Sequence, residues 1–293
     1  MQTYLNYVMR NGVKDIVHTN ITRLNQDEKI LRASLQQQTK NKRYCSDFTL
    51  RYLYQVLREQ PPEKVFAQLL TGFELANHDP RVVGINIVQA EDGKIAMRDY
   101  TQQMKMIAFL KKCYPNVRVS LHAGELVPSL VPKSGLRFHI RQAVEIAHFA
   151  MKIMLNNYFN LSSNEAILGV KGAAHPIVLY RRYGVPVTLS TDDEGVLRTN
   201  LSEQYKKAVL TYHFSYKSLK TLIRNSLHYS FLPGKALWQD DHYQKVVPVC
   251  QSSLQSGVIP VPCQQFLNTN EKANLQWKLE VQFSIFERSF LKK

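Results

Sequence analysis

Two segments of the chain place ionisable side chains directly after short runs of alternating apolar residues. In the first segment the run is followed by His122 and Glu125, and in the second it is followed by the pair Asp192 and Asp193. An imidazole and a carboxylate are ordinary zinc ligands, and further carboxylates beside them suit proton transfer and hydrogen bonding to a substrate. These residue types at these places indicate a metal-dependent hydrolytic site.

Each segment also has a purely structural interpretation. A His-x-x-Glu pair after a strand is commonly no more than part of a loop, and an Asp-Asp pair ahead of a helix commonly caps that helix and complements its dipole. Both segments, however, occupy the equivalent place in two βα units. Because the carboxyl ends of parallel strands converge on one face of an α/β barrel, where active sites lie, the coincidence favours a site.

The elements that must position these residues follow from hydrophobic patterning. Between residues 45 and 195 short β-branched or aromatic runs alternate with amphipathic stretches, which is typical of βα units around a parallel sheet. Clear strands are expected over 48–56, 81–88, 117–121 and 185–190, and weaker ones over 3–9 and 158–161. Helices are expected over 63–75, 95–113, 138–155, 202–210, 218–229 and 271–291. Residues 25–42 suit an exposed helix or loop, and 240–270, rich in Pro, Gln and Ser, suit irregular structure.

Composition places the chain among ordinary globular proteins. It has 293 residues, of which 44% are hydrophobic. The first residues lack the pattern of a signal peptide, and no run approaches the ~18 apolar residues of a membrane span. The four cysteines, at positions 45, 113, 250 and 263, are few and scattered and form no CxxC pair. We therefore expect reduced cysteines, a cytoplasmic location and no membrane partner.

The chain is strongly basic, with a formal net charge of +15. The excess is dispersed in short clusters such as residues 40–43, without the interleaved aromatic residues of a single-strand binding platform. This pattern favours a solvated basic surface over a nucleic-acid site.

The two motifs resemble a known family. His122-Ala123-Gly124-Glu125 and Ser190-Thr191-Asp192-Asp193 are similar, in the same order, to the signature tetrapeptides of the adenosine deaminase family. The resemblance is closest to the longer, growth-factor-like branch, and it extends through residues 81–85, 138–141, 161–164, 175–177 and 225–234. It implies an α/β fold of the TIM (β/α)8-barrel type.

The resemblance also implies a role for each site residue. His122 and Asp192 would be ligands of one zinc ion, Glu125 would protonate the purine ring nitrogen, and Asp193 would hydrogen-bond the substrate. Gly84 would line the purine pocket, where a side chain would obstruct the base. The implied reaction is the hydrolytic deamination of adenosine to inosine and ammonia.

Other parts of the family pattern do not occur in this sequence. It contains no His-x-His pair, which in the family supplies two zinc ligands from the first barrel strand. A family strand with His-Gly is also missing, because His148 is followed by Phe149 within an expected helix. His139 and His175 lie near the site by resemblance but are expected to hold loops. These departures predict a barrel that is N-terminally truncated and internally deleted, with about six of eight strands.

We therefore expect a single domain over 1–293, with a partial barrel over 1–210 and a helical extension over 211–293. One functional hypothesis is a zinc-dependent adenosine deaminase, completed by another chain or a homo-oligomer. A second is a non-catalytic remnant, acting as a binding or interaction protein or left as a decayed gene product. A third, nucleic-acid binding, is disfavoured by the dispersed charge.

Overall fold

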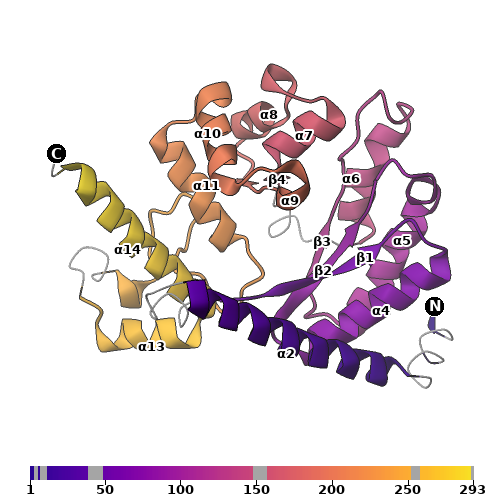
Figure 1. The fold of residues 1–293 in the computed structure, drawn as a ribbon, viewed down its shortest axis with the longest axis horizontal. Coiled ribbons are helices and arrows are strands. Elements are labelled where there is room, and N and C mark those ends of the chain that lie inside the picture. The colour runs from indigo at the N-terminus through magenta and orange to yellow at the C-terminus, as the bar shows by residue number, and fades with distance from the viewer. Residues whose placement is uncertain (3–5, 7–11, 39–48, 148–156, 252–257, 292–293) are drawn as a thin grey trace. The chain divides into compact units, whose positions relative to one another are not determined.

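The computed structural model describes residues 1–2, 6, 12–38, 49–147, 157–251 and 258–291. The chain divides into two compact units, Met1–Met151 and Lys152–Lys293, and each is described by itself (Figure 1). The expected strand over 3–9 falls, except for residue 6, outside the described residues, as does His148.

The first unit is built on a three-stranded parallel sheet in the order β1-β2-β3. The strands are β1 (Tyr52–Leu57), β2 (Val82–Val88) and β3 (Val119–Leu121). Helix α4 (Pro62–His78) connects the first two strands and α5 (Lys94–Cys113) connects the second and third, and both lie beside the sheet (Figure 1). Helix α6 (Gly135–Glu145) follows the third strand. All three strands therefore end at the same edge of the sheet, the edge at which His122 leaves β3.

One face of this sheet packs against the helices. Val56, Ile85 and Ile87 are fully buried, whereas Leu53 and Leu57 on the opposite face of β1 are exposed. Gly72 lets α4 approach closely, because a Cβ there would lie 2.6 Å from the Tyr54 ring and 2.9 Å from Ile85. Alternating burial of this kind is what period-2 strand geometry requires when a single face is covered.

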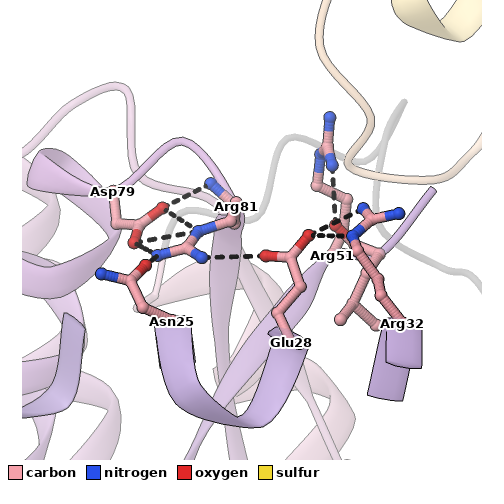
Figure 2. Close-up of polar contacts among 7 residues, drawn as sticks. Asn25, Glu28, Arg32, Arg51, Asp79 and Arg81 are labelled. Atoms are coloured by element: carbon pink, nitrogen blue, oxygen red, sulfur yellow. Dashed lines mark hydrogen bonds and ion pairs between the residues drawn. The ribbon is translucent and has the colours of Figure 1, made fainter. Parts of the chain in front are cut away.

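Helix α2 (Val13–Gln38) docks on the first unit through an apolar stripe and then through charges. The Glu28 carboxylate lies between two guanidinium groups, accepting from Arg81 Nη1 at 2.9 Å and from Arg32 Nη2 at 2.7 Å (Figure 2). Arg81 also forms a fork on Asp79, with Nη2 2.6 Å from Oδ2, and donates to Asn25 Oδ1 at 2.8 Å. These hydrogen bonds lower the pKa of Glu28 and of Asp79.

Replacing Glu28 with Gln is expected to loosen α2. The substitution removes the charge that two arginines share, which costs about 1 kcal/mol for a partly exposed pair and raises the open fraction of α2 roughly fivefold. Amide hydrogen exchange along α2 measures the effect. Asp27→Asn is the matched control, because Asp27 is exposed and lies 3.9 Å from Arg23. Equal exchange rates along α2 in the two variants would contradict the role of Glu28 in holding this helix.

The second unit holds a two-stranded parallel sheet of β4 (Asn157–Phe159) and β5 (Val187–Leu189). Its helices are α7 (Leu161–Leu168), α8 (Ile177–Arg182), α9 (Glu194–Leu197), α10 (Leu201–Tyr212), α11 (Tyr216–His228), α13 (Val261–Thr269) and α14 (Glu271–Leu291). The described part of this unit also holds two short 3-10 helices, Gly172–Ala174 and Pro248–Cys250. Leu161, Ile177 and Leu189 belong to the core beside the sheet, and a separate core surrounds Trp238 and Trp277.

The α/β class with parallel strands is confirmed, and the part of the chain that the structure describes holds three parallel strands in the first unit and two in the second, as expected of an incomplete barrel. The long helix expected over 271–291 is present, whereas the irregular structure expected over 240–270 is partly wrong. Helix α13 forms there because its prolines, at 260 and 262, lie at the helix start, where no intrahelical N–H is needed. None of the helices in the described ranges is long and apolar enough to cross a membrane.

The expectation that the cysteines are reduced is wrong for one pair. Cys250 and Cys263 form a disulfide, with Cα atoms 4.8 Å apart. They are 13 residues apart in the sequence and come together because the 3-10 helix at Pro248–Cys250 packs on α13. Spacing alone did not reveal the pair, because no CxxC pattern marks it.

Replacing both Cys250 and Cys263 with Ser is expected to lower the free energy of unfolding by about 2–3 kcal/mol, because the bond restricts the unfolded chain. Denaturant titration followed by tryptophan fluorescence measures the loss, since Trp238 and Trp277 share a core with the disulfide. Cys113→Ser is the control, because Cys113 is an exposed free cysteine. A double variant as stable as this control would show that the bond contributes nothing.

Candidate active site

His122 lies directly after β3, at the carboxyl edge of the first unit's sheet. Its Nδ1 is 3.0 Å from the carbonyl oxygen of Ile87 and 3.3 Å from Oδ1 of Asn86, both on β2. Since both neighbours are oxygen acceptors, Nδ1 carries the proton and Nε2 carries the lone pair. This tautomer, fixed by a backbone carbonyl, is the one that metal-binding histidines usually adopt.

Residues 122–125 form a short loop, called the 122–125 loop below, that requires its glycine. Gly124 has a φ of 90°, which favours glycine over other residues. A Cβ there would also lie 2.5 Å from Cδ1 of Ile140. The loop is held by Glu91, whose Oε1 accepts from Gly124 N at 2.9 Å and whose Oε2 accepts from Glu125 N at 2.8 Å. The sequence motif is thus a defined backbone turn that carries Glu125 at a fixed place.

Buried polar side chains lie behind this loop. Arg58, which is 0% exposed, donates from Nη2 to the carbonyl oxygens of His122 at 2.9 Å and Ile87 at 3.3 Å. Burial lowers the pKa of Arg58, whereas the nearby carboxylate of Glu91 opposes that shift. Glu91 also lies 2.6 Å from Nδ1 of the buried His139. His139 therefore holds a loop, as expected.

Sequence reasoning did not identify Glu91 or Arg58. Each follows a strand at its carboxyl end, Arg58 after β1 and Glu91 three residues after β2. Ionisable residues after the carboxyl ends of strands pointed to His122 and Asp192, and the same rule applies to Arg58 and Glu91. The position after a strand could therefore have identified them.

Asp192 and Asp193 follow β5 in the second unit. Asp192 has a positive φ of 58°, which is uncommon for a residue with a side chain and clusters at functional sites. Its Oδ2 accepts from Oγ of Ser163 at 2.6 Å. Asp193 precedes α9 without a side-chain capping bond, and the cap of α10 is Asn200, which accepts from Glu203 N at 3.0 Å. Asp193 therefore occupies the N-cap position of α9, and the Asp pair does not cap the helix near Ser202, which is α10.

His175 joins two helices of the second unit. Its Nδ1 accepts from the backbone N–H of Ile177, at the start of α8, at 3.2 Å, and its Nε2 lies 3.2 Å from Nδ2 of Asn164 on α7. The side chain is 1% exposed, and burial lowers its pKa to about 4. A neutral His175 thus holds its loop in place, as the sequence suggested.

Gly84 lies within β2 and is buried, paired with Leu53. It lies three residues before Ile87, whose carbonyl oxygen contacts Nδ1 of His122. Gln89, the first residue after β2, has a φ of 79°, in the left-handed region. The role of Gly84 in a purine pocket stays a prediction.

A catalytic zinc ion usually has three protein ligands. His122 has the orientation of a ligand, but it belongs to the first unit and Asp192 to the second. Within residues 12–38, 49–147, 157–251 and 258–291, no three His, Cys, Asp or Glu side chains are grouped so that they could hold a metal ion. The described donors do not fit a complete zinc site, and we derive no chemical step through a metal.

Comparison with known proteins identifies relatives. Residues 153–238 match the family model described as adenosine deaminase. The chain is 28% identical over 190 residues to the adenosine deaminase of Clostridium kluyveri, covering 60% of this chain and 51% of that protein. It is 38% identical over 69 residues to the aminodeoxyfutalosine deaminase of Streptomyces coelicolor, covering 23% of this chain and 18% of that protein. The chain thus spans about half, or less, of the length of these curated relatives.

Two solved structures are also similar. One is the Arabidopsis protein ADAL complexed with IMP, with a TM-score of 0.48 and 19% identity, covering 71% of this chain and 59% of that chain. The other is the adenine deaminase from Arthrobacter aurescens, with a TM-score of 0.46 and 22% identity, covering 60% of this chain and 55% of that chain.

Proposed function

We propose that this chain, a member of the adenosine deaminase family, binds a purine nucleoside through its two motif segments and contributes catalytic groups to hydrolytic deamination. The observation that supports this most strongly is the 122–125 loop. His122 is held in the tautomer of a metal ligand, and Glu125 is held beside it by a buried carboxylate. A loop with a purely structural role needs neither feature.

Each residue receives a role in this proposal. Glu125 holds the proton that is delivered to the purine ring nitrogen, and Asp193 hydrogen-bonds the base. Gly84 leaves room for the base, and His122 and Asp192 would each act as a zinc ligand. The net reaction is adenosine plus water giving inosine plus ammonia. Further zinc ligands would come from outside the described residues, from another chain or from a second copy of this one.

A second candidate function is non-catalytic purine binding. The observation in its favour is that the described residues contain no group of three metal ligands. Such a protein would keep the nucleoside contacts and lack the activated water.

One experiment separates the two functions. The purified chain is assayed for bound zinc by elemental analysis and for conversion of adenosine to inosine by chromatography. The deaminase proposal predicts stoichiometric zinc and turnover. A folded chain that binds nucleoside without zinc or turnover is the non-catalytic protein, and a folded chain that binds no nucleoside contradicts both.

We also propose an oxidising compartment for this chain. The disulfide between Cys250 and Cys263 is the observation that favours it over the expected cytoplasmic location, because thiols are kept reduced in the cytosol. Cell fractionation followed by thiol labelling tests this, and both cysteines labelled in freshly lysed cells would contradict it.

A further inference from the structure

We infer that Glu91 is a positioning residue for the proposed active site, since it fixes the 122–125 loop from behind. The inference rests on the proposed function for its catalytic consequence. Its structural basis is independent of that function, because it is a set of contacts that the described residues make within the first unit.

Both carboxylate oxygens of Glu91 are engaged on the loop. Oε1 accepts from Gly124 N at 2.9 Å, and Oε2 accepts from Glu125 N at 2.8 Å. Two adjacent backbone N–H groups therefore point at one carboxylate, which fixes the plane of the turn as well as its distance from the sheet. Because Gly124 needs a positive φ of 90° for this geometry, the glycine and Glu91 specify the same turn.

Glu91 is itself held in place. It is 3% exposed, and its Oε1 lies 2.6 Å from Nδ1 of His139, which is 1% exposed. The His139 ring stacks on Tyr100, with centroids 3.7 Å apart, and the Tyr100 hydroxyl donates to the carbonyl oxygen of His139 at 3.1 Å. The carboxylate therefore has a buried, oriented partner in addition to the two loop amides.

The charge of Glu91 strengthens these contacts. A buried carboxylate is stable only when donors surround it, and hydrogen bonds to an ionised acceptor are about twice as strong as those between neutral groups. The two loop amides are such donors. Arg58 holds the same loop at its other end by donating to the carbonyl oxygen of His122 at 2.9 Å. The position of Glu125 relative to His122 thus follows from two buried, oppositely charged side chains.

The test replaces Glu91 with Gln, which keeps the shape and removes the charge and one acceptor. The matched control is Glu59→Gln, because Glu59 also accepts from two backbone amides, those of Ile95 and Ala96, but at the start of α5. We expect exchange of the Gly124 or Glu125 amide to accelerate about tenfold or more in Glu91→Gln. The control should leave both of these amides unchanged.

Three results would each overturn the inference. The first is unchanged Gly124 and Glu125 exchange in Glu91→Gln, and the second is equal acceleration in Glu59→Gln. The third is wild-type Gly124 and Glu125 amides that exchange as fast as an unstructured peptide, which decides the matter even if Glu91→Gln fails to fold.

A catalytic readout distinguishes positioning from simple stabilisation. If the wild-type chain turns over adenosine, Glu91→Gln should lower kcat at least tenfold with KM within about twofold, since Glu91 touches no substrate. An unchanged kcat would show that the loop needs no such support. If the wild-type chain lacks turnover, the proposed function fails while the exchange measurement still decides the role of Glu91.

Discussion

Replacing Glu125 with Gln is expected to lower the rate of adenosine deamination by about 10²–10⁴-fold, the usual contribution of a general acid. The amide of Gln has the same shape but cannot deliver a proton to the purine ring. The backbone N–H of residue 125 still donates to Glu91, so the loop is expected to keep its conformation. Nucleoside affinity should therefore change little while turnover falls.

Steady-state kinetics and nucleoside titration of the same preparations measure the two effects separately. The control is Glu145→Gln on α6, where Glu145 is exposed and pairs only weakly with Arg141, at 3.8 Å. Turnover in Glu125→Gln equal to that of this control would exclude Glu125 as the proton donor.

Acidification from pH 6.5 to 4 is expected to destabilise the second unit by up to about 3 kcal/mol through His175 alone. Burial lowers the pKa of His175 to about 4 from the ordinary 6.5. Below pH 6.5 the unfolded chain therefore binds a proton that the folded chain excludes, so stability falls as the pH falls, until the folded form also titrates near pH 4. Above pH 6.5 this contribution is complete.

Denaturant titrations at several pH values measure this slope. The fluorescence reports the second unit, because both tryptophans of the chain, Trp238 and Trp277, are buried there. His228 is partly buried, its pKa is also lowered by burial, and it acts in the same direction, so His175→Gln and His228→Gln are compared. His175→Gln should be less stable than the wild type at pH 7, and its free energy of unfolding should depend less on pH than that of His228→Gln. A wild-type slope retained in His175→Gln would contradict this account.

Local periodicity explains why much of the fold could be predicted. The strand over Val82–Val88 and the helices over Lys94–Cys113 and Glu271–Leu291 lie close to where apolar spacing placed them. In the two helices one face is buried against a neighbour, and in the strand Ile85 and Ile87 alternate onto the face that the helices cover, so period 3.6 or period 2 is imprinted on the sequence.

Features that depend on distant partners could not be predicted in this way. The bond from Arg58 to His122 joins residues 64 apart, and Glu91 contacts the loop from 33 residues away. The disulfide of Cys250 depends on how two short helices pack. No local pattern encodes these pairings: the strand-end rule applies to Arg58 and Glu91, but it does not say which residues they contact.

The motif segments are proposed to bind a purine nucleoside. Titration of the isotope-labelled chain with inosine, observed by amide NMR, tests it most directly, because the product is not consumed. Saturable shifts are expected at the amides of Glu125 and Asp193, whereas an amide outside the two segments, such as that of Lys278 on α14, should not shift. A folded chain in which neither segment responds to inosine would contradict it.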